Sequence, residues 1–165
     1  MKVLLLVRHA KSSWDDITMK DFDRPLNERG KKDAPEMAER VKEQGLKISY
    51  FVSSPAKRAK RTARYFAEAF GKDKDDIQVL ENLYEPTAQA FADAVAALPD
   101  GEDVVAIFSH NPAITEYVNS LANVRVDDMP TCGVFAVAMD EKSWSAFASA
   151  DKRFLFFDYP KNPIA

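Results

Sequence analysis

Residues 2–10 read Lys2-Val3-Leu4-Leu5-Leu6-Val7-Arg8-His9-Ala10, and this stretch decides the fold of the 165-residue chain. Its apolar part lacks the alternation of a half-buried strand, which is typical of a strand covered on both faces. An arginine and a histidine follow it directly. Parallel sheets place reactive groups just beyond the carboxyl ends of their strands, where loops open a crevice. The stretch therefore predicts a buried strand in a parallel sheet, with functional side chains at its end.

A second stretch has the same design. Val104 to Phe108 is apolar, and Ser109-His110-Asn111-Pro112 follows it. The chain has two histidines in all, His9 and His110, so both of them lie in this context. Two independent loop histidines are the alternative, but the repeated context favours one shared site.

The rest of the chain alternates between strand and helix patterns. Asn27 is a predicted N-cap for a helix that ends near Gly45, and Ser54-Pro55 opens a second helix. Two late strands are predicted to form a hairpin or an addition at the sheet edge. After the first strand, the predicted elements are helix 27–45, strand 48–53, helix 54–70, strand 77–80, helix 88–98, strand 104–108, helix 112–121, strand 133–139 and strand 153–157. This order favours an α/β layered fold with a largely parallel sheet, in a single domain over residues 1–165.

Composition narrows the function classes. Hydrophobic residues make up 46% of the chain, enough for a substantial core. The net charge of −3 argues against nucleic-acid binding as the main function, although 23 lysines and arginines leave room for a local basic cluster. Cys132 is the single cysteine, which excludes an internal disulfide and a cysteine-rich zinc site. The apolar run before Arg8 is too short for a signal peptide or a membrane span, so we expect a soluble cytoplasmic protein without a membrane partner.

Arginines accompany the histidines at the strand ends. Arg8 precedes His9, and Ser53-Ser54-Pro55-Ala56-Lys57-Arg58 lies at the end of the strand predicted over 48–53. A guanidinium offers a planar fork of donors that fits phosphate oxygens. A neutral imidazole can attack phosphorus and carry it as a phosphoramidate. Such a set suits phosphoryl transfer, in which positioning and charge neutralisation dominate.

Four segments together resemble one known family. In chain order they are Leu6-Val7-Arg8-His9-Ala10, Pro25-Leu26-Asn27-Glu28-Arg29-Gly30, Ser53-Ser54-Pro55-Ala56-Lys57-Arg58-Ala59-Lys60-Arg61-Thr62-Ala63 and Ser109-His110-Asn111-Pro112. They are similar to the motifs of the histidine phosphatase superfamily, also called phosphoglycerate mutase-like. The short length and the opening Arg-His-Ala-Lys-Ser-Ser-Trp look most like its small SixA branch, the phosphohistidine phosphatases. The resemblance runs from residue 3 to about residue 135 and implies a three-layer α/β/α sandwich.

The resemblance implies a role for each matching residue. His9 would be the nucleophile that becomes transiently phosphorylated, Arg8 and Arg58 would clamp the phosphate, and His110 would donate to the developing charge. Ser12 stands where the family often places a small polar residue that faces the phosphate. Arg58 is chosen only by its position in the motif, because its basic neighbours are typical of a solvated helix face. These neighbours are Lys57, Lys60, Arg61 and Arg64.

Three positions depart from the family pattern or leave a role open. Ala10 replaces the usual glycine, so its backbone must avoid the left-handed region. Asp15 stands where asparagine is common, and it either weakens phosphate binding or points to solvent or to Lys11. Glu85 lies where larger members carry an acidic proton donor, with a simple loop carboxylate as the alternative. A missing acid would favour a phosphohistidine substrate, because imidazole leaves more easily than an alkoxide.

These patterns predict a phosphatase that uses no metal and no other cofactor. Its expected partner is a phosphorylated substrate such as a histidine-phosphorylated signalling protein, without nucleic acid. A phosphatase for small phosphate esters and a slow phosphoprotein-binding module are the alternatives. Cysteine phosphatase chemistry is excluded, because the position six residues after Cys132 is Ala138 instead of arginine. His9 and His110, far apart and without an adjacent carboxylate pattern, give a weak metal signal.

Overall fold

One six-stranded sheet forms the centre of the molecule, in the order β3-β2-β4-β1-β5-β6. The structure is a computed structural model that describes residues 1–162. Strands β1 to β4 are mutually parallel, whereas β5 runs antiparallel to β1 and β6 runs antiparallel to β5. The strands are β1 (Lys2–Arg8), β2 (Tyr50–Ser53), β3 (Ile77–Val79), β4 (Val104–Ser109), β5 (Val134–Met139) and β6 (Arg153–Asp158). The predicted terminal hairpin is confirmed as β5–β6.

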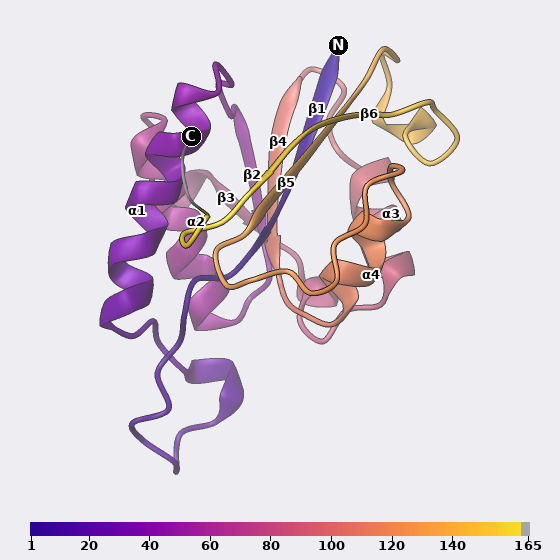
Figure 1. The fold of residues 1–165 in the computed structure, drawn as a ribbon. Helices are drawn as coiled ribbons and strands as arrows, with labels where there is room; N and C mark the ends of the chain where they lie inside the picture. Colours follow the sequence, from indigo (N-terminus) through magenta and orange to yellow (C-terminus); the bar gives the residue numbers. More distant parts are fainter. Residues whose placement is uncertain (163–165) are drawn as a thin grey trace.

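Helices cover both faces of this sheet (Figure 1). They are α1 (Glu28–Glu43), α2 (Lys57–Ala69), α3 (Ala88–Ala96) and α4 (Ala113–Asn119), with 3₁₀ turns η1 (Asp21–Asp23), η2 (Lys74–Asp76), η3 (Glu81–Leu83) and η4 (Trp144–Ala146). Helices α1 and α2 pack on one face, and α3 and α4 pack on the other. The predicted α/β/α sandwich is confirmed. Within residues 1–162, no helix combines the length and the apolar character needed to cross a membrane.

Strand β1 shows why its sequence lacks alternation. Leu4 and Leu6 belong to the apolar cluster under α3 and α4, whereas Val3 and Leu5 belong to the cluster under α1 and α2. All four side chains are buried. A strand buried on both faces needs apolar residues at every position, so the prediction from residues 2–7 is confirmed.

Helix α1 begins where the sequence predicts. The Asn27 side chain accepts a hydrogen bond of 2.8 Å from the amide of Gly30, which satisfies one of the free donors of the first turn. Packing also requires a glycine at position 30, because a Cβ there would clash with the carbonyl oxygen of Lys11. The first turn of α1 therefore rests directly against the loop that follows β1. Helix α2 begins at Lys57, later than predicted, since Ser54 and Pro55 form the turn that follows β2.

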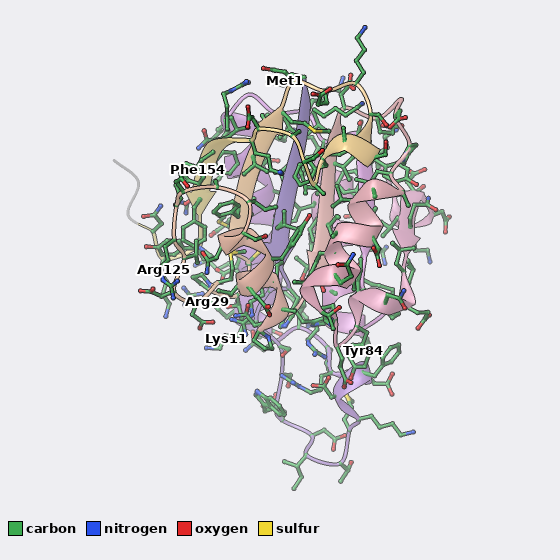
Figure 2. All side chains as sticks on the ribbon, turned by 90° about the vertical axis from the view of Figure 1, so that its right-hand side faces the viewer. Met1, Lys11, Arg29, Tyr84, Arg125 and Phe154 are labelled. Atoms are coloured by element: carbon green, nitrogen blue, oxygen red, sulfur yellow. The ribbon has the colours of Figure 1, made fainter. Side chains whose placement is uncertain are left out.

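The carboxyl ends of β2, β4 and β1 lie side by side. Arg8 at the end of β1 is paired with Ser109 at the end of β4, and Ser53 at the end of β2 is paired with Phe108. From β1 the chain continues to α1 on one face, and from β4 it continues to α4 on the other. Such a switch between neighbouring parallel strands opens a crevice at their carboxyl ends. Figure 2 shows Lys11 and Tyr84 at this end of the molecule and Met1 at the opposite end.

Candidate active site

A pocket of about 340 Å³ opens at the carboxyl ends of these strands. Its lining residues are Arg8, His9, Lys11, Ser12, Trp14, Arg24, Arg58, His110, Asn111 and Thr131. Four of these side chains carry a permanent positive charge, and the described lining includes no carboxylate. The pocket therefore attracts anions. Five of the six predicted site residues meet here, and the sixth, Glu85, does not.

His9 is held in the tautomer that a nucleophile requires. Its Nδ1 lies 2.8 Å from the carbonyl oxygen of Ala10, so Nδ1 carries the proton and donates it. The lone pair is therefore on Nε2. Burial lowers the pKa of His9 from its usual value to about 3, and the positive field of Arg58 and Arg8 adds to this effect. The ring is neutral near pH 7.

His110 lies beside His9, with their ring centroids 5.1 Å apart. Its Nε2 is 2.7 Å from the hydroxyl oxygen of Ser54, and that oxygen accepts from the amide of Ala56. The Ser54 hydroxyl, which accepts from Ala56, donates its own proton to His110 Nε2, so the proton of the neutral His110 ring is on Nδ1. Burial lowers the pKa of His110 to about 3, and the positive charge of Arg58 is the second cause of this decrease. His110 is thus a neutral donor through Nδ1.

Two buried side-chain atoms in the described part of the chain lack a hydrogen-bond partner, and both belong to pocket residues. They are Arg8 Nε and His110 Nδ1. Arg8 is oriented by a bond of 2.8 Å from its Nη1 to the carbonyl oxygen of Met129. Unpaired buried donors are costly, and an anion bound in the pocket would satisfy both of these.

Arg58 reaches the pocket from the first turn of α2. Its Nε lies 3.4 Å from His9 Nε2, which places the guanidinium beside the lone pair of the imidazole. The other nitrogens donate to Asp21, at 2.7 Å to the backbone oxygen and 3.0 Å to the carboxylate. Thr62, one turn later, accepts from the amide of Ala10 and so fixes α2 to the loop that carries His9. The Arg58 guanidinium is therefore held by Asp21, and the helix that carries Arg58 is held by the bond between Thr62 and Ala10.

Asp21 is a functional candidate that the sequence patterns missed. Its carboxylate accepts hydrogen bonds from Arg58, from the Tyr84 hydroxyl at 2.7 Å and from Arg24 at 2.9 Å. Partial burial opposes ionisation, but the bonds from Tyr84 and Arg58 outweigh it and lower the pKa of Asp21 to about 2. Asp21 is ionised near pH 7 and ties the exposed η1 turn to the pocket.

Arg24 is a second residue that the patterns missed, although it directly precedes the Pro25 motif. It is 7% exposed, and its guanidinium donates to the hydroxyl of Ser12 and to the carbonyl oxygen of Ser13. The guanidinium lies 3.2 Å from the centroid of the Trp14 ring. Ser12 therefore faces the pocket through a bond to Arg24, and Trp14 forms part of the pocket rim.

Glu85 lies outside the pocket. It lines a separate surface depression together with Tyr84, and its φ of 49° is unusual for a residue with a side chain. The Tyr84 ring instead packs edge-on against His110, with centroids 5.6 Å apart. Burial and the bond to Asp21 raise the pKa of Tyr84 to about 12. The position next to the histidines is thus occupied by Tyr84 and Asp21.

The remaining departures from the family pattern are accommodated. Ala10 is buried and is absent from the residues of positive φ within the described chain, as its sequence required. Asp15 is exposed and does not line the pocket, which agrees with the alternative that its side chain points to solvent. Cys132 is a buried free cysteine, and burial raises the pKa of its thiol.

Comparisons with known proteins agree with this geometry. The model of the histidine phosphatase superfamily (branch 1) matches residues 4–89. An uncharacterized chloroplast protein of Arabidopsis thaliana is 28% identical over 155 residues, which cover 88% of this chain and 70% of that protein. Phosphoserine phosphatase 1 of Hydrogenobacter thermophilus is 42% identical over 71 residues, 42% of this chain and 33% of that protein. The chain thus matches about a third of that enzyme's length.

Solved structures show the same fold. A SixA protein from Agrobacterium tumefaciens has a TM-score of 0.80 at 24% identity, with 96% of this chain and 98% of that chain covered. A protein histidine phosphatase SixA complexed with tungstate has a TM-score of 0.80 at 22% identity, with 96% and 97% covered. The matched model spans more than half of the 165 residues and includes the segments that carry His9 and Arg58. The chain belongs to the histidine phosphatase superfamily (branch 1) and is a phosphatase.

Proposed function

We propose that this phosphatase acts on phosphohistidine in a protein partner and that His9 is its nucleophile. One observation carries the proposal: a neutral imidazole with its lone pair on Nε2 faces a pocket of four cations. An imidazole of this kind can form a bond to phosphorus without first losing a proton. The cations neutralise the oxygens of the transferring group, which is the main catalytic requirement of phosphoryl transfer.

The first step transfers the phosphoryl group to the enzyme. His9 Nε2 forms a bond to phosphorus while the bond between phosphorus and the partner's imidazole nitrogen breaks, and that nitrogen keeps the electron pair. Arg8 Nε and His110 Nδ1 donate to the equatorial oxygens, and Arg58 stands beside the new N–P bond. The His9 Nδ1–H bond to Ala10 stabilises the positive charge that develops on the ring.

The second step regenerates the enzyme. A water oxygen attacks phosphorus, the bond to His9 Nε2 breaks with its electron pair on that nitrogen, and inorganic phosphate leaves as H₂PO₄⁻ with both protons of the water. His9 returns to its neutral tautomer, because its low pKa disfavours protonation near pH 7. Lys11 and Arg24 extend the positive charge of the pocket toward its rim, where the partner would lie.

The leaving group decides between phosphohistidine and ordinary esters. An alkoxide needs a proton donor, whose contribution is typically about 10²–10⁴-fold. Glu85 lies outside the pocket, and Asp21 is ionised with a pKa of about 2, so neither carboxyl group is a ready donor. Imidazole is a better leaving group than an alkoxide, which favours an N–P substrate.

The similar proteins support this choice without deciding it. Three of the similar structures are SixA proteins, one of them bound to tungstate, a tetrahedral oxyanion like phosphate. A small phosphate ester is the second candidate substrate, because phosphoserine phosphatase 1 is 42% identical over the segment that it shares with this chain.

The test compares two phosphate donors with the same enzyme. One is a phosphotransfer domain phosphorylated on histidine, and the other is 4-nitrophenyl phosphate. We expect kcat/KM for the phosphoprotein to exceed that for the ester by at least about 10²-fold, the lower range of a proton donor's contribution. A faster reaction with the ester assigns the enzyme to small esters. Binding of the phosphoprotein without release of phosphate indicates a binding module instead.

A further inference from the structure

Helix α2 carries two different sets of basic residues. Arg58 faces the pocket, whereas four other cations recur with the spacing i, i+3, i+4 and i+7 and so share one side of the helix: Lys57, Lys60, Arg61 and Arg64. The first three of these are exposed. The candidate active site uses none of the four.

This side of α2 forms one wall of a groove of about 340 Å³, here called the basic groove. Its lining residues are Lys57, Lys60, Arg61, Arg64, Lys74, Asp75, Ile77 and Val79. Five cations face one carboxylate, although the whole chain has a net charge of −3. Arg64 pairs with Glu68 at 2.9 Å, and the other four cations form no ion pair within residues 1–162.

The position of these cations is unfavourable for the helix itself. The amino-terminal end of a helix carries a partial positive charge, and the first turn of α2 has no acidic residue and no side-chain cap. Like charges three and four residues apart also repel one another. An anion in the basic groove would relieve both effects, so the groove is suited to a negatively charged ligand.

We propose that the basic groove binds an acidic segment of the phosphorylated partner protein. The proposal rests on the proposed function, because it assigns to the partner the phosphohistidine that enters the pocket next to Arg58. Lys57 lines the groove and the adjacent Arg58 lines the pocket, so the first turn of α2 contributes to both sites. Strand β3 is at the edge of the sheet, and its Ile77 and Val79 give the groove an apolar wall beside a backbone edge that pairs with no further strand within residues 1–162.

A protein segment fits the groove better than a nucleic acid. Proteins that bind single-stranded nucleic acid combine positive charge with aromatic side chains on which the bases stack. The described lining of the basic groove contains no aromatic side chain. Its apolar wall consists of two β-branched residues on an edge strand, which suits an extended peptide.

The dimensions of α2 define the test peptide. Lys57 and Arg64 are seven residues apart, which is roughly 10 Å along a helix at 1.5 Å per residue. An extended peptide covers this length with about three residues. The test peptide therefore spreads its carboxylates over the interval about three to eight residues from the phosphohistidine, which is longer than the groove itself.

The experiment uses two phosphohistidine peptides of equal length, one with four glutamates in this interval and one with four serines. We expect the full-length enzyme to prefer the acidic peptide by about tenfold in kcat/KM at low salt and to lose the preference in 0.5 M NaCl. The double variant Lys60→Glu/Arg61→Glu should lose the preference but keep the wild-type rate with the serine peptide and with 4-nitrophenyl phosphate. The control Lys47→Glu/Lys142→Glu has the same net charge at exposed positions away from the groove and should behave as wild type.

A binding measurement separates this proposal from the proposed function. Fluorescence anisotropy with the unphosphorylated glutamate peptide reports on the groove even if phosphohistidine is not a substrate. Loss of binding in the Lys60→Glu/Arg61→Glu variant, but not in the control, supports the groove. Equal binding by the two variants overturns the proposal, as does an equal peptide preference in the kinetics. Tighter binding of a single-stranded oligonucleotide of equal charge would assign the groove to nucleic acid instead.

Discussion

The strand ends and the η1 turn both contribute to the candidate active site, but they are held in different ways. His9 and His110 follow buried parallel strands and are 7% and 5% exposed, so the sheet fixes their backbone. Asp21 lies on an exposed turn and is held by side-chain bonds to Arg58 and Tyr84. The two histidines are thus fixed by the core, whereas Asp21 depends on a few polar contacts.

Replacing His9 should have the largest effect. His9→Ala removes the attacking nitrogen, so kcat should fall by at least about 10³-fold with a phosphohistidine peptide, because the Nε2 lone pair of the second pocket imidazole, His110, is engaged by the Ser54 hydroxyl. Circular dichroism of the variant should match the wild type. Wild-type turnover by this variant would refute a covalent role for His9.

Replacing Arg58 should cause the second-largest loss of activity. Arg58→Ala removes a donor beside the new N–P bond, and we expect a loss of about 10²–10³-fold in kcat/KM with 4-nitrophenyl phosphate. Arg61→Ala is the matched control, because Arg61 is exposed on the same helix and lies outside the pocket. Similar losses in both variants would mean that general charge, and not position, explains the effect.

Replacing Asp21 tests the polar contacts that hold the η1 turn to the pocket. Asp21→Ala frees the guanidinium of Arg58 but also removes a negative charge near the pocket. We therefore expect kcat to fall by about tenfold while KM for 4-nitrophenyl phosphate stays the same or decreases. Asp23→Ala changes an exposed carboxylate of the same η1 turn that forms no ion pair within residues 1–162, and it should leave both constants unchanged. A rise in KM alone would indicate that Asp21 only supports substrate binding.

Glu85 should matter least among the substitutions. It lies outside the pocket, so Glu85→Gln should change kcat/KM by less than about twofold with either the phosphohistidine peptide or the ester. A loss of about 10²-fold that is specific to the ester would instead identify Glu85 as a proton donor that reaches the pocket when substrate binds.

The two histidines should not titrate near neutral pH. Their folded-state pKa values of about 3 lie below the usual 6.5, so both rings stay neutral while the unfolded chain takes up protons. The free energy of unfolding should therefore decrease as the pH falls from about 6.5 toward 3. NMR of the two imidazole Cε1 protons checks this: neither signal should move between pH 8 and 5. A midpoint near 6.5 for His9 would contradict its neutral, buried state.

The same division between core and rim explains what the sequence could predict. Strands β1 and β4 were predictable because burial on both faces leaves a continuous apolar run, and their ends located His9 and His110. Glu85 lines a different depression from the histidines, and no local pattern specifies its backbone φ of 49°. Asp21 was missed because it contacts residues 37 and 63 positions away. Arg24 did carry a signal, since it precedes the Pro25 motif.

The central claim is that His9 Nε2 accepts the phosphoryl group, and trapping the intermediate tests it most directly. The enzyme is mixed with a labelled phosphohistidine peptide, quenched in alkali within milliseconds and mapped by mass spectrometry. We expect one acid-labile phosphoryl group, located on His9, that forms at least as fast as inorganic phosphate is released. Release of phosphate without any labelled enzyme, or a label on another residue such as His110, would contradict it.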